Sequence, residues 1–343
     1  MPNTFVRIGL FVLTVIIAAF TLGLFSLLFL SGGVERFGAL SVAFGVITYA
    51  ALELMVNRKH YKSGVDDALL WMAAAFIVGG INASANVPPL ANAWIIFLIS
   101  LFLSLRFINL LMSAVACIAL LAIVFYSYIR LGDIAKATTP FLIMIVCSLI
   151  YLLSKKLLRM EPWRQYNNCL TMISIAALVC FYIAGNYFIV RESSIAMFNL
   201  NLQDGQSIPL GWLFWIFTVL IPPVYIIRGI QKKDAVLLRT GLLLVAGMIF
   251  TIRYYYHIAS IETAMAFGGI IMIAIAYVLI KYLHEPKHGF TYREQTDKLF
   301  IDKLQIESLI IAESFTGPSA QPAAGNTAFG GGSGGGGGAT GNF

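Results

Sequence analysis

The chain has 343 residues, of which 59% are hydrophobic and 11% are charged. A soluble domain carries roughly 25% charged residues, so this composition excludes a water-soluble globule. The net charge of +7 does not indicate a nucleic-acid-binding protein, because the basic residues stand at the ends of apolar runs and not on one basic face. The four cysteines lie inside apolar runs without a CxxC pair, which predicts neither a disulfide framework nor a thiolate metal site.

The first apolar run, residues 8–30, follows Arg7 and has the outline of a signal peptide. It is longer than a typical signal-peptide core, and the SGGVER sequence after it lacks an A-x-A cleavage pattern. We therefore expect a first membrane span that is retained.

Ten apolar runs in the chain are long enough to be membrane spans, because about 20 residues at ~1.5 Å per residue cross ~30 Å of hydrocarbon. The predicted spans are 6–30, 37–56, 65–82, 89–105, 107–129, 137–154, 168–190, 209–228, 236–253 and 260–282. The runs are apolar on every side, whereas strands of a membrane barrel would alternate. The sequence therefore predicts an all-α, polytopic transmembrane helix bundle of about ten spans. Only Arg106 separates the fourth and fifth spans, which leaves open whether they form one broken helix.

The distribution of Lys and Arg predicts the orientation of these spans. With the amino terminus in the cytoplasm, ten spans return the carboxyl terminus there, and most of the 23 Lys and Arg residues fall on the cytoplasmic side. We predict a multi-pass protein of the bacterial inner (cytoplasmic) membrane with both termini cytoplasmic.

One external loop, residues 191–209, has appreciable length, and apolar and polar residues alternate over 198–203. This alternation predicts a short strand-like or interface-lying segment. The aromatic run Tyr254–Tyr256 precedes the last span. It fits an interfacial aromatic belt, and an aromatic cage stays open as the alternative.

Composition divides the chain into three parts. Residues 1–283 form the predicted transmembrane helical domain, and residues 284–316 form a short cytoplasmic juxtamembrane segment. From residue 317 to 343 the chain is rich in Pro, Ala, Ser and Gly, which predicts a disordered tail because such a sequence cannot bury apolar surface.

The candidate site residues are charged residues at the ends of spans. Arg253 and Glu262 face each other across the last predicted turn, at the outer interface. The second candidate set lies at the inner interface, where the acids are Glu53 and Asp67 and the basic partners are Arg239 and Arg106. We interpret both sets as structural ion pairs, with a functional site as the alternative. No charged residue is predicted at the bilayer midplane, which argues against a proton-coupled carrier.

Pro222 and Pro223 lie inside the eighth predicted span, where they remove backbone hydrogen bonds. A static kink is one interpretation. The alternative is a broken helix that lines a substrate site, as in carriers. No histidine motif or catalytic residue set is present, so we assign no catalytic, cofactor-binding or metal-binding residue and expect no cofactor.

Two segments carry a resemblance to a known group: GVDDALLW at 64–71 and FTIRYYYHIASIETAMAFGGIIMIAIAYVLIKYL at 250–283. They resemble uncharacterised bacterial polytopic inner-membrane proteins that contain a domain of unknown function. The Gly-rich end with its terminal aromatic residue is similar to the tails of some Bacteroidetes envelope proteins. The resemblance implies a membrane location but no activity, substrate or site residue.

These observations favour a non-catalytic membrane or envelope component that acts through partners. The alternative is a carrier of a small or lipid-like solute, motivated by Pro222 and Pro223. The expected partners are the lipid bilayer and other membrane or envelope proteins, and no nucleic acid.

Overall fold

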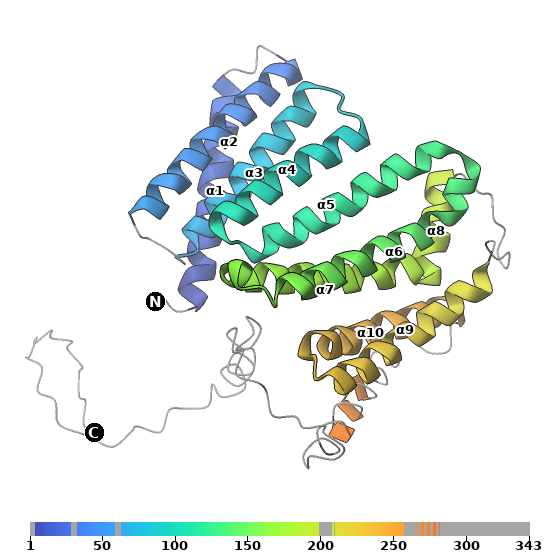
Figure 1. Ribbon diagram of the computed structural model, residues 1–343. Coiled ribbons are helices and arrows are strands. Elements are labelled where there is room, and N and C mark those ends of the chain that lie inside the picture. The colour runs from blue at the N-terminus through green and yellow to red at the C-terminus, as the bar shows by residue number, and fades with distance from the viewer. Residues whose placement is uncertain are drawn as a thin grey trace, which may run out of the picture. The chain divides into compact units, whose positions relative to one another are not determined.

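The computed structural model describes residues 4–28, 33–58, 63–198, 208 and 210–256, together with single helical residues between 266 and 281. All regular structure within these residues is helical. The helices are α1 (Thr4–Leu28), α2 (Gly33–Asn57), α3 (Val65–Ser84), α4 (Pro89–Phe107), α5 (Leu110–Tyr128), α6 (Asp133–Leu157), α7 (Asn167–Gly185), α8 (Tyr187–Phe198), α9 (Gly211–Lys232) and α10 (Ala235–Tyr256) (Figure 1). Two short 3₁₀ helices, Ile129–Leu131 and Glu161–Tyr166, join α5 to α6 and α6 to α7.

Nine helices in the described part of the chain are long and apolar enough to cross a membrane. Only α8, with 12 residues, is too short. The protein is therefore a multi-pass, all-α membrane protein, as the composition predicted. The tenth predicted span lies almost wholly outside the described residues. The juxtamembrane segment 284–316 and the tail 317–343 lie entirely outside them.

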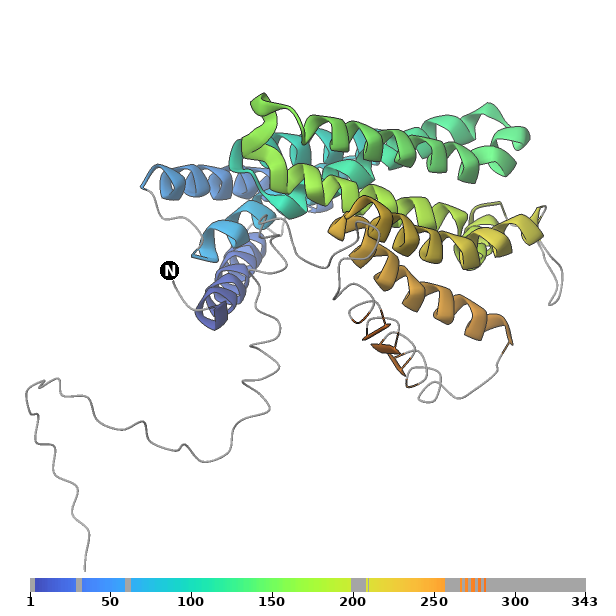
Figure 2. The ribbon, with the colours of Figure 1, turned by 60° about the horizontal axis from the view of Figure 1, so that its bottom comes forward.

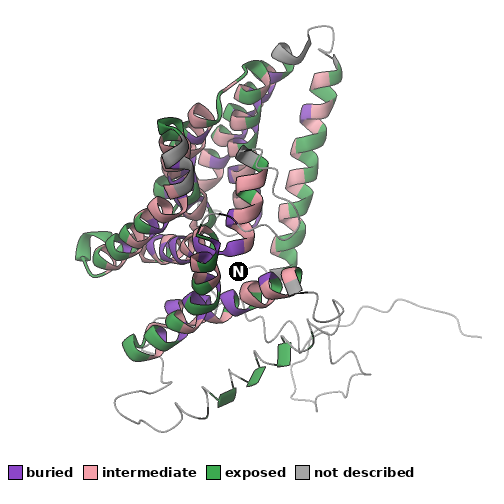
Figure 3. Ribbon diagram, turned by 90° about the vertical axis from the view of Figure 1, so that its right-hand side faces the viewer, coloured by how far each residue is buried: buried purple, intermediate pink, exposed green. Residues whose placement is uncertain are grey.

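Helices that follow one another in sequence form the closest pairs: α2 with α3, α4 with α5, α6 with α7, and α9 with α10 (Figures 1 and 2). Short connections force each pair to run antiparallel. Helix α7 links the α6–α7 hairpin to the α4–α5 and α9–α10 hairpins, because it also contacts α5, α8, α9 and α10. Along most helices, buried, intermediate and exposed residues are interspersed (Figure 3). This pattern fits helices that face both neighbours and lipid.

The α2–α3 hairpin packs with its backbones in close contact. A Cβ atom on Gly80 would lie 2.6 Å from the carbonyl oxygen of Gly38, and one on Gly45 would lie 2.9 Å from the backbone nitrogen of Ile77. Across the same contact, the Ser41 hydroxyl donates to the Phe76 carbonyl at 2.9 Å. Small residues at a helix crossing allow this approach, which is a main source of association between helices in lipid.

The structure resolves the open question about the fourth and fifth spans. Helix α4 ends at Phe107, Ile108 adopts a left-handed conformation with φ 51°, and Asn109 caps α5 by accepting a hydrogen bond from the Met112 nitrogen at 3.1 Å. The two segments are therefore separate helices.

The seventh predicted span, 168–190, is wrong at its carboxyl-terminal end. Its helix α7 ends at Gly185, Asn186 is extended, and a second helix, α8, begins at Tyr187. The predicted loop is also helical from residue 191 to Phe198, so the strand-like interpretation is wrong at Phe198. Residues 199–203 lie outside the described residues. Hydropathy missed the break because the residues after Asn186 are still apolar.

Candidate functional site

Ionisable residues gather where α2 and α4 end and where α3 begins. Because each hairpin reverses the chain, these ends lie at one level. The connection between α6 and α7 reaches the same level, since the Tyr166 hydroxyl donates to the Leu105 carbonyl at 3.3 Å. We call this region the charged end, and its members are Arg7, Glu53, Asp67, Arg106, Lys155 and Asp234.

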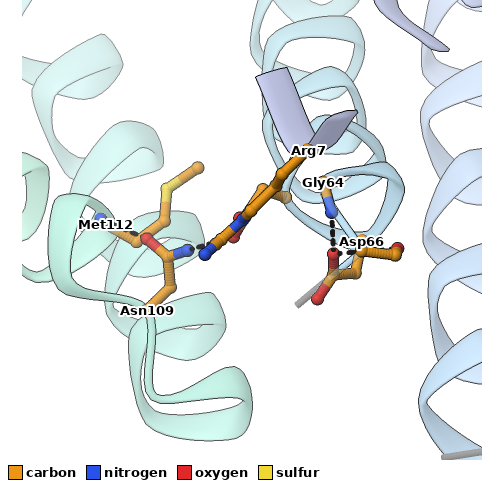
Figure 4. Close-up of polar contacts among 7 residues, drawn as sticks. Arg7, Gly64, Asp66, Asn109 and Met112 are labelled. Carbon is orange, nitrogen blue, oxygen red and sulfur yellow. Dashed lines mark hydrogen bonds and ion pairs between the residues drawn. The ribbon is translucent and has the colours of Figure 1, made fainter. Parts of the chain in front are cut away.

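The first contact in the charged end joins α1 to α3. The Arg7 guanidinium forms an ion pair with the Asp67 carboxylate. The amide of Asn109, at the start of α5, donates to the other Asp67 oxygen at 3.3 Å. Figure 4 shows Arg7 extending toward Asn109, while Asp66 accepts a hydrogen bond from the Gly64 nitrogen at 3.0 Å. Three helices thus meet at Asp67.

The second contact joins α2 to α4. The Arg106 guanidinium donates to both carboxylate oxygens of Glu53, from Nε at 3.0 Å and from Nη2 at 2.9 Å. The Tyr49 hydroxyl also donates to Glu53, at 2.9 Å. The Arg106 side chain is 47% exposed and lies over the Phe107 ring, 5.5 Å from its centroid. A planar guanidinium that donates two parallel bonds holds a carboxylate in a fixed orientation.

The third contact joins α6 to the turn before α10. Lys155 Nζ lies 2.7 Å from Asp234 Oδ2, and the Tyr151 hydroxyl donates to the same carboxylate at 3.2 Å. Asp234 also caps α10, because its other oxygen accepts from the Val236 nitrogen at 3.1 Å. Asp234 is not among the sequence-predicted site residues, although an Asp just before an apolar run is a typical helix-start signal.

The structure brings together one of the predicted pairs of charged residues at the inner interface. Glu53 lies with Arg106, whereas Asp67 lies with Arg7, which was not among its candidate partners. Arg239 lies on α10, a helix that packs on α9 and α7. Arg253 is in the last turn of α10, and Glu262 lies outside the described residues, so their pairing stays a prediction.

Pro222 and Pro223 lie inside α9, which continues through them to Lys232. Pro222 is almost fully buried. The preceding residue, Ile221, packs against the end of α7, where a Cβ atom on Gly185 would lie 3.1 Å from its Cδ1 atom. The two prolines therefore directly follow a residue that contacts the end of α7. Sequence reasoning identified the prolines but not the break at the end of α7.

A network of buried, uncharged polar groups surrounds this break. The Asn186 amide nitrogen donates to the Thr251 hydroxyl oxygen at 2.9 Å and to the Tyr182 hydroxyl oxygen at 3.0 Å. The first backbone nitrogen of α8, at Tyr187, donates to the Thr218 hydroxyl oxygen at 2.9 Å. These four side chains, Tyr182, Asn186, Thr218 and Thr251, are between 0% and 4% exposed. We call them the polar joint, because they connect α7, α8, α9 and α10.

An aromatic cluster lies beside the polar joint. The Tyr187 ring stacks on Trp215 with centroids 4.9 Å apart, and Tyr255 contacts both rings at 5.1 and 5.7 Å. The Arg191 guanidinium lies 5.6 Å from the Tyr255 centroid. The cation over the Tyr255 ring is therefore a side chain of the protein itself. Burial by itself would lower the pKa of Arg191, but the neighbouring Tyr255, Tyr187 and Glu192 raise it, so the side chain stays charged.

Comparisons with known proteins leave the site to be interpreted from its own geometry. No family model matches the chain, and no curated protein or solved structure is significantly similar to it. Within the described residues, no group of three His, Cys, Asp or Glu side chains is arranged to hold a metal ion. The four cysteines are free and lie within helices.

Proposed function

We propose that this multi-pass membrane protein is a non-catalytic membrane component that acts through partners. The proposal rests on how the charged end is connected. Its three ion pairs join α1 to α3, α2 to α4, and α6 to the start of α10. The first pair therefore connects α1 to a hairpin, and the other two connect helices of different hairpins. Side chains used in this way fix the positions of helices.

The polar joint supports the same proposal from the opposite ends of α7 and α10. Its hydroxyl and amide groups hydrogen-bond one another and are almost fully buried. Alternating access requires one group of helices to rock against another. Helices that are joined at both ends resist such motion, which favours a fixed platform over a carrier.

A second candidate, a carrier of a small or lipid-like solute, is favoured by one observation. The seventh span is interrupted at Asn186, beside Ile221 of α9, and interrupted helices with polar residues line substrate sites in carriers. In this interpretation the polar joint opens during transport and its side chains exchange their hydrogen bonds for bonds to the solute.

Locking the polar joint separates the two candidates. Asn186→Cys and Thr251→Cys are introduced together into the full chain, in a background in which the four natural cysteines are replaced by Ala. Oxidation then joins α10 to the break after α7. Two properties are compared before and after oxidation: the size of the complex in native electrophoresis of gently solubilised membranes, and the flux of solutes from proteoliposomes.

For a non-catalytic component, the chain migrates as a defined complex with other proteins, and the lock changes neither the complex nor the background flux. A chain that migrates alone and shows a flux that oxidation abolishes would overturn the proposal and establish the carrier. The matched control is Asn186→Cys alone, which cannot form the bond and must behave the same with and without oxidant.

A further inference from the structure

An apolar groove of about 310 Å³ lies between α2, α3 and α4. Its lining includes Tyr49, Ala74, Ile77, Leu98 and Phe102, and the surface of the lining is almost entirely apolar. Leu98 and Phe102 are more than half exposed, so the groove opens sideways from the helices. All three helices are long and apolar enough to span the membrane, so the groove faces hydrocarbon and not water.

Tyr49 connects this groove to the charged end. Its ring lines the groove and lies 6.0 Å from the Phe102 ring, while its hydroxyl donates to Glu53. Glu53 is one helical turn beyond Tyr49, and Arg106 is one turn beyond Phe102. The apolar groove thus ends at an adjacent carboxylate and guanidinium, of which the guanidinium is half exposed. This arrangement matches an amphipathic molecule that has a hydrocarbon chain and a headgroup with both charges.

We propose that the groove binds one acyl chain of a zwitterionic aminophospholipid from the surrounding bilayer. Arg106 faces the phosphate of the lipid, and Glu53 faces its ammonium group. The opposite charges of the Arg106–Glu53 pair complement those of the headgroup, whereas a lipid with net negative charge would place its phosphate near Glu53 without a compensating ammonium. This lipid site is independent of the function proposed above.

The test measures which lipids remain bound to the full chain. The protein is purified in mild detergent with equal amounts of phosphatidylethanolamine and phosphatidylglycerol, and native mass spectrometry counts each retained lipid. We expect wild type to retain phosphatidylethanolamine. Ala74→Leu fills the groove and should reduce retention by at least about tenfold, because excluding two methylenes from an apolar site already exceeds one decade of affinity.

The matched control is Ala75→Leu, the same change at the next position of α3, where the side chain is exposed and does not line the groove. It should retain lipid as wild type does. A second filling variant, Leu98→Trp, changes an exposed residue at the mouth of the groove and should also reduce retention. This variant still tests the groove if Ala74→Leu disturbs the contact between helices. Thermal melting of Ala74→Leu shows whether it does.

The headgroup assignment is tested by Glu53→Gln. Removing the carboxylate leaves Arg106 without its anionic partner, so the retained lipid should change from phosphatidylethanolamine to phosphatidylglycerol. Equal retention by the Ala74→Leu, Leu98→Trp and Ala75→Leu variants would overturn the site. Retention of phosphatidylglycerol by wild type, or an unchanged preference in Glu53→Gln, would overturn the assignment of the headgroup contacts.

Discussion

The charged end and the polar joint connect helices by different chemistry. The charged end uses full charges on side chains that are partly exposed, such as Arg106 at 47%. The polar joint uses uncharged amide and hydroxyl groups that are at most 4% exposed. A charged side chain at the end of a span can turn to water when its partner is removed, whereas a buried amide has no water to turn to. The uncharged groups of the polar joint are therefore expected to contribute more to stability than the ion pairs of the charged end.

The largest loss of stability is expected for Asn186→Leu in the polar joint. The change removes the hydrogen bonds from Asn186 to Tyr182 and Thr251 and keeps the number and branching of the side-chain heavy atoms. The Thr251 hydroxyl still donates to the Gly247 carbonyl. Each buried polar group left without a partner costs about 1–3 kcal/mol, so we expect a loss of about 3 kcal/mol of unfolding free energy. Thermal melting in detergent measures it. Asn82→Leu, at an exposed amide on α3, is the control and should change stability little.

A second experiment tests backbone packing at the end of the α2–α3 hairpin that lies opposite to the charged end. Gly80→Ala places a methyl group 2.6 Å from the Gly38 carbonyl oxygen, which backbone atoms cannot accommodate without a shift of α2. Overpacking of this kind costs about 1–3 kcal/mol. Gly79→Ala adds the same group at the preceding position, where nothing lies within 4 Å, and should be neutral. Equal melting temperatures of the two variants would show that α2 and α3 do not pack this closely.

The ion pair itself should contribute less than either of these contacts. Glu53→Gln leaves Arg106 partly exposed and able to reach water, so the expected loss is about 1 kcal/mol or less. A double-mutant cycle with Arg106→Gln measures the coupling between the two side chains. A loss for Glu53→Gln larger than that for Asn186→Leu would reverse the comparison between the two regions.

The smallest effect is expected at the predicted Arg253–Glu262 pair. Glu262→Gln should reduce stability by less than about 1 kcal/mol, because Arg253 is close to the end of α10 and can reach the interface. Exchanging the two charges should recover much of the loss caused by reversing either one. Strictly additive losses in thermal melting, without recovery, would mean that the two residues do not meet.

The sequence predicts the number of the described spans and, except for the seventh, their approximate limits, because hydropathy depends on composition alone. It also places Glu53, Asp67 and Arg106 at one level, since short turns fix where each helix starts and ends. It does not predict that Asp67 meets Arg7, because the choice of partner depends on which helices are neighbours. That order follows from packing contacts such as Gly38 against Gly80, which are local in space and far apart in the chain.

The break at Asn186 shows a different limit of sequence reasoning. Gly185 and Asn186 are both poor helix residues and form a usable signal for an interruption. Tyr187 to Val190 are apolar, however, and extend the hydrophobic run past the true end of α7. Asn186 bonds to Thr251 on α10, and the next backbone nitrogen, at Tyr187, bonds to Thr218 on α9, so only the tertiary structure explains why these buried polar groups are stable.

The position of α7 has a consequence for how the protein is made. The Asn186 amide, which follows its last residue, hydrogen-bonds to Tyr182 of α7 and to Thr251 of α10, and α10 is synthesised later. Until α10 has been inserted, the Asn186 amide at the end of the seventh span lacks its Thr251 partner. We therefore expect the hairpins of α2 to α5 to assemble first during translation, and α7 to acquire its final position only when the last helices arrive.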